Sequence, residues 1–136
     1  MQTTLLKSAY NILGSISIGN GLWMLFFAAS WYKNIPAGIE DTGPLNTHFV
    51  HDIGLVYFLV GVGAIWCAMN LEKCFPIHLT LTLFVAGHAL IHIVEILVGL
   101  LPPSHWLIDF PLIFLPAILL IGLTKPVRRL YKAHAS

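Results

Sequence analysis

The sequence predicts an all-α integral membrane protein, a bundle of four transmembrane helices, and three observations lead to that prediction. Hydrophobic residues make up 57% of the 136 residues, charged residues make up only 10%, and the mean hydropathy is +0.83. Soluble domains usually carry roughly 25% charged residues, so this composition excludes an ordinary soluble domain. The apolar residues also gather in four long stretches, and the basic residues lie almost entirely at one end of those stretches. A net charge of +1 excludes a nucleic-acid binder, because such a protein needs a strongly basic surface.

Each apolar stretch is long enough to cross a bilayer as a helix, which takes about 20 residues. The predicted helices cover about residues 8–29, 47–69, 76–100 and 106–123. Prolines and polar residues separate them, including Pro36 and Pro44 in the first connection and Pro102-Pro103 in the third. The stretches are about twice as long as the strands of a membrane barrel, which excludes a β-barrel. We therefore expect residues 1–136 to form one transmembrane domain.

The basic residues predict the orientation of this bundle. If the N-terminus is cytoplasmic, six of the seven Lys and Arg residues lie on the cytoplasmic side, and only Lys33 lies outside. This distribution obeys the positive-inside rule and places both termini in the cytoplasm. Trp31, Tyr32 and Trp106 would then lie at the outer membrane interface, where aromatic residues are common. We expect a multi-pass protein of a bacterial inner membrane.

The most informative residues are histidines and carboxylates within the apolar stretches. An ionisable side chain inside a membrane span costs several kcal/mol unless it is paired, so each one is a candidate functional residue. The second helix begins with such a group, the third carries a stripe at i, i+4 and i+7, and the fourth carries a pair at i and i+4. These residues are His48, His51 and Asp52, then His88, His92 and Glu95, and finally His105 and Asp109.

The depth of these residues predicts that they belong to one site. With a rise of 1.5 Å per residue, the carboxylates and most of the histidines lie roughly 5–12 Å below the outer ends of three helices, and His88 lies deeper. No Lys or Arg lies in the outer half of any helix to pair with Asp52, Glu95 or Asp109. A bound cation would neutralise these acids. Mixed imidazole and carboxylate ligands favour zinc or iron, with manganese or copper as the next candidates.

The predicted site binds one or two divalent metal ions near the outer face. Asp109 is predicted either to bind the metal directly or to accept a hydrogen bond from a residue that binds it. Two questions remain open at the mouth of this site. His105 is either a ligand or an interfacial residue. The connection over residues 31–46, which contains Glu40 and Asp41, is a lid over the site, a cation-attracting rim or an ordinary interfacial loop. The other predicted ligands are His48, His51, Asp52, His88, His92 and Glu95.

The predicted function is that of a membrane metalloprotein, and a metal-dependent enzyme is favoured over a non-catalytic protein. The reaction would be a redox or hydrolytic step on a lipid, a quinone or a small solute, because an open metal position can activate water or engage O₂. A b-type haem protein with His51 and His92 as axial ligands is one alternative. The others are a metal-free lipid isomerase or proton-coupled transporter that uses Asp52 and Glu95, and an accessory subunit of a membrane complex. An oligomer is compatible with each of them.

Residues outside this cluster have structural interpretations. Cys67 and Cys74 are not spaced as CxxC and are expected to be free thiols. His78 and His134 are expected to be solvated on the cytoplasmic side, away from the site. Small residues form stripes on the first two helices and predict a close approach between them. Those residues are Gly14, Ser17, Gly21, Gly54 and Gly61.

Overall fold

The computed structural model describes residues 2–135, and Met1 and Ser136 of the predicted domain lie outside this range. The fold is all helical, with 83% of the residues in helices and no strand among the described residues. The longer helices are α1 (Gln2–Phe26), α3 (Thr47–Met69), α4 (Phe75–Leu97) and α6 (Leu115–Ala135). Between them lie the shorter elements α2 (Ala28–Asn34), η1 (Ile39–Thr42), α5 (His105–Ile108) and η2 (Phe110–Phe114).

Three helical segments are long and apolar enough to cross a membrane, so the chain has the character of a membrane protein. They are α3 over Thr47–Met69, α4 over Phe75–Leu97, and the joined η2 and α6 over Phe110–His134. The helix α1 has 25 residues but is interrupted by polar side chains such as Lys7, Asn11 and Asn20, and it is not among these three segments. The four-span bundle and its orientation therefore remain predictions.

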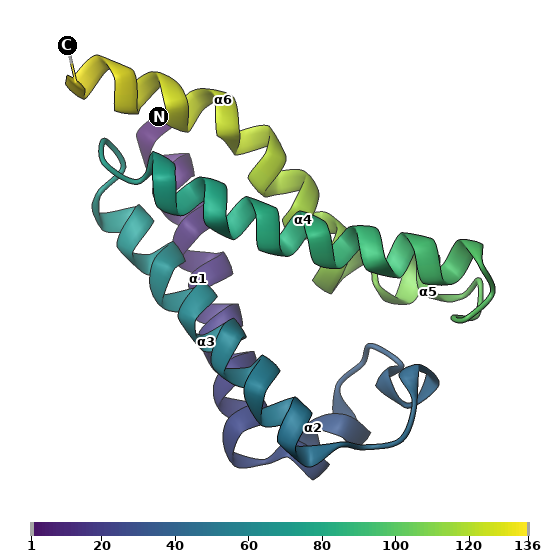
Figure 1. Ribbon diagram of the computed structural model, residues 1–136. Helices are drawn as coiled ribbons and strands as arrows, with labels where there is room; N and C mark the ends of the chain where they lie inside the picture. The colour runs from purple at the N-terminus through teal and green to yellow at the C-terminus, as the bar shows by residue number, and fades with distance from the viewer. Residues whose placement is uncertain (1, 136) are drawn as a thin grey trace.

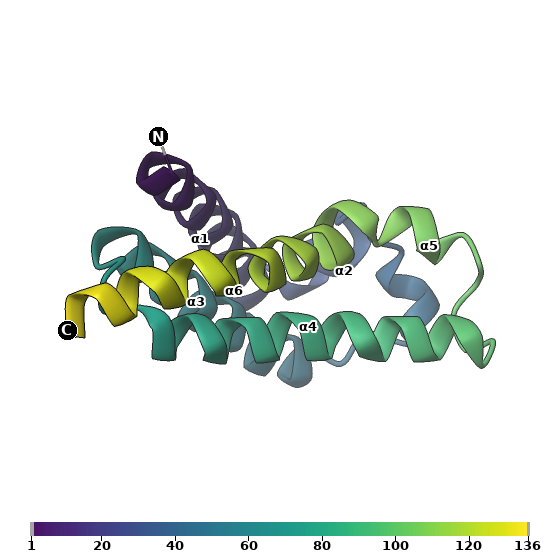
Figure 2. The ribbon, with the colours of Figure 1, turned by 90° about the horizontal axis from the view of Figure 1, so that it is seen from above.

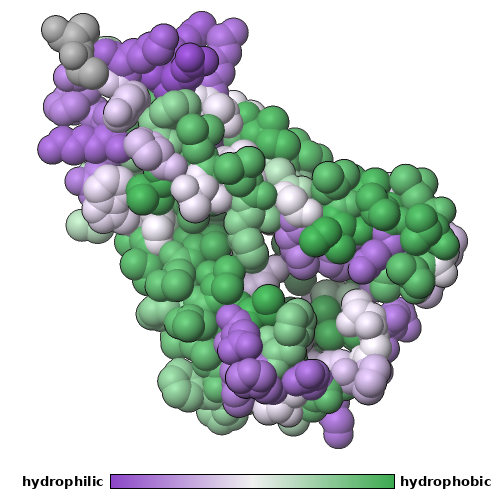
Figure 3. Space-filling view, in the orientation of Figure 1, coloured by the Kyte–Doolittle hydropathy of each residue, from purple (hydrophilic) through white to green (hydrophobic). Residues whose placement is uncertain are grey.

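The helices form two arms that diverge from one end of the molecule (Figure 1). In the first arm α1 packs along α3, and in the second α4 packs along α6. The view from above shows α4 and α6 running side by side (Figure 2). The space-filling view shows the molecule hollowed between the arms, and the segment between α2 and α3 borders this hollow (Figure 3).

Glycines allow α1 and α3 to lie in contact, as their spacing predicts. A Cβ atom at Gly21 would lie 2.7 Å from the carbonyl oxygen of Gly54. A Cβ atom at Gly61 would lie 2.7 Å from the carbonyl oxygen of Gly14. Side chains at these positions would push the two backbones apart, so the small residues determine the helix separation in this arm.

The chain after α1 differs from the predicted helix end and loop. Phe27 leaves the helical conformation with φ −140° and ψ 46°, and α2 then continues to Asn34, so the first helix does not simply end near residue 29. The indole Nε1 of Trp31 donates to Oδ1 of Asn20 at 2.8 Å, which gives the mid-helix amide a partner. The hydroxyl of Tyr32 donates to the carbonyl oxygen of Gly43 at 2.7 Å. These contacts hold the remaining connection, residues 35–46, against the α2 end of the first arm.

The fourth predicted helix is divided into three elements. The short α5 is followed by a π-helical turn, η2, in which the carbonyl oxygen of Asp109 accepts from the amides of Ile113 and Phe114 at 2.8 and 3.2 Å. Pro111 lies in this turn and has no amide hydrogen to continue an α-helical pattern. The helix α6 then runs to Ala135 instead of ending near residue 123. A π-helical turn changes the direction of the side chains around it, and here it follows a buried carboxylate.

Candidate metal centre

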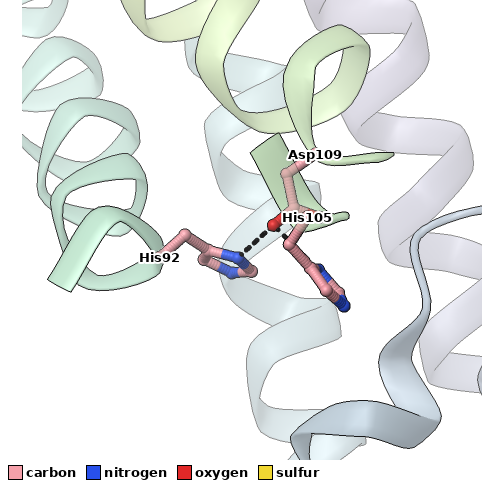
Figure 4. Close-up of side chains that lie close together, drawn as sticks. All are labelled: His92, His105 and Asp109. Atoms are coloured by element: carbon pink, nitrogen blue, oxygen red, sulfur yellow. Dashed lines mark hydrogen bonds and ion pairs between the residues drawn. The ribbon is translucent and has the colours of Figure 1, made fainter. Parts of the chain in front are cut away.

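Three polar side chains from two separate helical elements converge near the far end of the second arm (Figure 4). His92 lies on α4, one face of which packs against η2 and α6. His105 is the first residue of α5, and Asp109 lies at the junction of α5 and η2. All three side chains are buried. The i, i+4 spacing of the latter two residues brings them to the same face of the α5 turn, as the sequence predicts.

Asp109 is the centre of this cluster. Its Oδ2 lies 2.8 Å from Nδ1 of His92 and 3.0 Å from Nδ1 of His105. One ligand atom from each of the three residues can be chosen so that all three atoms lie within 4.8 Å of one another. We call His92, His105 and Asp109 the buried triad.

The second carboxylate oxygen of Asp109 has no hydrogen-bond partner within residues 2–135. Asp109 is fully buried, and its Oδ1 accepts no hydrogen bond from any residue that the structure describes. Leaving a buried acceptor unsatisfied costs about 1–3 kcal/mol, and more for a charged group. Oδ1 of Asp109 therefore presents a lone pair for which the described part of the chain supplies no donor.

His105 lies between two carboxylates. Its Nδ1 faces Asp109, and its Nε2 lies 3.1 Å from Oδ2 of Asp41. Burial of the ring favours the neutral form, but the hydrogen bonds and the charges of Asp41 and Asp109 outweigh burial and raise the pKa of His105. Only the protonated ring can donate from both nitrogens, so the geometry of the metal-free protein fits an imidazolium between Asp41 and Asp109.

The connection over residues 35–46 reaches the triad through Asp41, which lies in the short helical turn η1 and is about half exposed. Gly38 precedes this turn with φ 58°, a left-handed conformation that glycine adopts without strain. A Cβ atom at Gly38 would lie 3.1 Å from Cε1 of His105, so the connection also packs closely on the ring. The sequence left open whether this connection and His105 belong to the site. His105 is a member of the triad, and the connection contacts it through Asp41 and Gly38.

His88 lies beside the triad and not among its ligand atoms. Its ring meets the ring of His92 edge to face, with centroids 4.7 Å apart, and stacks on Phe84 with centroids 6.3 Å apart. Tyr57 of α3 packs edge-on against His88. The predicted i, i+4 pair of imidazoles is thus in contact, while aromatic rings surround the deeper member.

The candidates on α3 stand apart from the triad. Nε2 of His48 and Oδ2 of Asp52 form an exposed pair at 3.5 Å, with side chains 88% and 63% accessible. His51 is half-buried. Within residues 2–135 no hydrogen bond or ion pair joins these three residues to His92, His105 or Asp109. The predicted ligands on α3 therefore do not contact the triad through hydrogen bonds or ion pairs in the described structure.

Glu95 lies near the mouth of the site. It is half-buried and lines a small pocket with Asp41, Thr42, Leu100 and Leu101. No hydrogen bond in the described part of the chain joins its carboxylate to His51 or Asp52, the partners that its depth suggested. The shared pocket brings Glu95 and Asp41 to the same opening, so the only acid of α4 faces the connection and not the first arm.

Two expectations outside the site have clear outcomes. Cys67 and Cys74 are free and buried, as expected. His78 is fully buried, and the expectation that it is solvated is wrong. Its Nδ1 lies 2.7 Å from the hydroxyl of Tyr10, and its Nε2 lies 3.0 Å from the hydroxyl of Thr124. His78 therefore links α1, α4 and α6 at the end of the molecule opposite the triad.

The sequence indicates Asp41 only as part of a possible cation-attracting rim with Glu40, and it does not predict the contact with His105. An acid in a connection between helices carries no periodicity that could assign it to a site. The available signal is the acidic pair Glu40 and Asp41 in the longest connection. Compared with known proteins, the chain matches no family model, no curated protein and no solved structure.

Proposed function

We propose that the protein is an integral membrane metalloprotein that binds a divalent cation in the buried triad of His92, His105 and Asp109. The observation that carries this proposal is the unsatisfied Oδ1 of Asp109, a buried anionic oxygen beside two imidazoles. A cation there would supply the missing partner and would balance the two acids, Asp41 and Asp109, that flank His105. Orientation by the positive-inside rule places this site near the outer face of the membrane.

The donors match the preferences of zinc and iron. Two imidazoles and one carboxylate make a mixed nitrogen and oxygen set, which suits zinc or iron and, next, manganese or copper(II). Adjacent ligand atoms of a tetrahedral zinc lie about 3.3 Å apart, as bonds of about 2.0–2.1 Å require. In the metal-free triad the contacts of Asp109 with the two histidines are hydrogen bonds, and a cation would replace the protons between Nδ1 of each histidine and Oδ2 of Asp109. The distances of 2.8 and 3.0 Å would then need to open by about 0.5 and about 0.3 Å.

Three protein ligands are the number that catalytic zinc sites use, because they leave a coordination position for water or substrate. Bound there, the metal would lower the pKa of a water molecule or, as iron, would engage O₂. Exposed apolar side chains flank the triad, with Leu107 82% and Phe110 48% accessible. Their exposure supports a lipid or quinone that reaches the site from the bilayer over a small solute.

Metal content tests the proposal. The protein would be purified without a histidine tag or chelators, and bound metals would be measured by mass spectrometry. We expect about one ion per chain, and His92→Ala should weaken binding by more than about 100-fold because a direct ligand exceeds the 10- to 100-fold effect of supporting residues. His48→Ala is the matched control, since that histidine is exposed and outside the triad. Equal loss in both variants, or no bound metal in the parent protein, would contradict the proposal.

The wider ligand set is tested by the same measurement. A second ion would require His51, Asp52 and Glu95 to act together, with His88 and His48 in support. Under that proposal Glu95→Gln lowers the metal content from about two ions to one. Under the triad alone, Glu95→Gln leaves one ion bound.

A metal-free proton pathway is the second candidate function, and one observation favours it. Asp41, His105, Asp109 and His92 form a continuous series of contacts of 3.1, 3.0 and 2.8 Å from a half-exposed acid to a buried imidazole. Such a series can pass protons between neighbours. Proton uptake into liposomes that contain metal-free protein, and its loss in Asp109→Asn, would support this function over metal binding.

A further inference from the structure

The end of the molecule opposite the triad is strongly basic and contains a second pocket. The start of α1, the connection between α3 and α4, and the C-terminal part of α6 meet there (Figure 1). The hydrophilic residues of this end form a continuous cap above an apolar body (Figure 3). The basic residues of α6 belong to this cap and comprise Lys125, Arg128, Arg129 and Lys132.

The pocket has a volume of about 390 Å³ and combines cationic with apolar walls. Lys7 of α1 and Lys73 of the α3–α4 connection supply positive charge, and Asn70 supplies an amide. Leu71 and Leu130 supply apolar surface. A pocket with this lining matches a ligand that has both an anionic and an apolar part.

The two lysines have no acidic partner among the residues that the structure describes. The pocket lining contains one acid, Glu72, whose Oε2 lies 3.1 Å from Nδ1 of His134. No ion pair in residues 2–135 uses Lys7 or Lys73. The pocket therefore carries an excess of positive charge.

The pocket lies just beyond the ends of two candidate membrane spans, at the level of the membrane surface. Met69 is the last residue of the α3 span, lines the pocket and is 74% exposed. The α4 span begins at Phe75, so residues 70–74 of the connection lie just beyond the apolar region. Phospholipid phosphates lie at this level, next to the hydrocarbon core.

We propose that this pocket binds the phosphate headgroup of an anionic phospholipid, with Lys7 and Lys73 as the cationic partners. Basic residues close to a membrane span attract anionic lipids with about 1 kcal/mol each, which is roughly fivefold in affinity. The acyl chains would extend from the pocket along the exposed apolar surface beside Met69. The inference is independent of the metal site, because no residue of the pocket belongs to the triad.

Native mass spectrometry in a neutral detergent tests the proposal, with phosphatidylglycerol compared to phosphatidylcholine. The parent protein should retain phosphatidylglycerol preferentially. The double variant Lys7→Gln/Lys73→Gln should lose roughly 25-fold in apparent affinity. The matched control is Lys125→Gln/Lys132→Gln, which removes the same charge from the basic end outside the pocket and should change affinity by less than about threefold. Circular dichroism of both double variants verifies that the fold is intact.

The results distinguish a specific phospholipid site from a diffuse basic surface and from a site for soluble phosphate. Equal loss of affinity in the two double variants would overturn the proposal in favour of a diffuse basic surface. Equal retention of the two lipids would also overturn it. A third arm adds millimolar inorganic phosphate, which should displace little lipid, because it lacks the apolar part. Full displacement would identify the ligand as soluble phosphate.

Discussion

Nδ1 of His92 lies 2.8 Å from Oδ2 of Asp109, and this contact joins α4 to the α5–η2 junction. An ionised carboxylate cannot donate, so the imidazole donates and its tautomer is determined by the contact. The same oxygen also accepts from His105 at 3.0 Å. One buried oxygen thus orients both imidazoles.

Removal of the metal should destabilise the protein, and Asp109→Asn should abolish that effect. A ligand that binds only the folded state at 100 times its Kd contributes about 2.7 kcal/mol to the free energy of unfolding. We therefore expect EDTA to lower the melting temperature in detergent and added zinc or iron to restore it. The asparagine retains the volume of Asp109 and removes its charge. A metal-dependent shift that persists in Asp109→Asn would show that the ion binds elsewhere.

The stability of the metal-free protein should decrease as the pH rises above neutrality. The pKa of His105 is raised in the folded state by Asp41 and Asp109. Its stabilising contribution is therefore fully present below the unfolded pKa of about 6.5 and is lost as the pH rises through the folded value. Thermal unfolding with EDTA between about pH 6 and about pH 9 should show this decrease. The decrease should be absent in His105→Gln, and an unchanged profile in that variant would assign it to another group.

Asp41→Asn should accelerate metal loss while hardly changing the stability. The Asp41 side chain is 49% accessible, so its contact with His105 contributes no more than about 1 kcal/mol to the free energy of unfolding. It is, however, the hydrogen bond that links η1 to the triad. We expect faster transfer of the bound ion to EDTA, followed by stopped-flow absorbance of a metal indicator. Glu40→Gln is the control, because Glu40 is a neighbouring exposed acid that makes no hydrogen bond or ion pair with the triad among the described residues. Equal acceleration in both variants would mean that only the charge matters.

Gly61→Ala should separate α1 from α3 and destabilise the first arm. A Cβ atom there would lie 2.6 Å from Cγ1 of Ile18 and 2.7 Å from two backbone atoms of α1. Overpacking of this kind costs about 1–3 kcal/mol in the free energy of unfolding. Gly19→Ala lies on α1 in open space and should instead stabilise the helix by about 0.5–1 kcal/mol. Unfolding titrations in detergent measure both variants, and equal effects would contradict the close contact of the helices.

Both termini should lie in the cytoplasm. Six of the seven Lys and Arg residues predict this orientation. The packing of α1 along α3 and of α6 along α4 leaves the start of α1 and the end of α6 at the same end of the molecule (Figure 1). Reporter domains fused separately before Met1 and after Ser136 should be active only in cytoplasmic assays. A C-terminal reporter that is active only outside the cell would reverse the orientation and place the triad on the cytoplasmic side.

Much of the helical architecture could be predicted because hydropathy and helix breakers act locally. The second predicted helix has the same bounds as α3, and the third agrees with α4 to within a few residues. Pro111 indicates an interruption of the fourth helix, but the π-helical form of the turn at Phe110–Phe114 and the break at Phe27 could not be predicted. The local sequence at both places is also compatible with a continuous or kinked α-helix. The choice between these conformations therefore depends on packing against other helices, which a local pattern does not encode.

The sequence by itself determined which residues could form a site, because a histidine or carboxylate in an apolar span is costly wherever the helix points. It therefore identified His92 and Asp109 and left His105 open. Tertiary structure alone decided which of the candidates meet. Periodicity relates residues to the face of their own helix, whereas the meeting of two faces depends on how each helix is rotated and how the two cross. The divergence of the arms leaves His48 and Asp52 exposed on α3, while the turn at Asp109 directs its carboxylate to His92 and the connection carries Asp41 to His105.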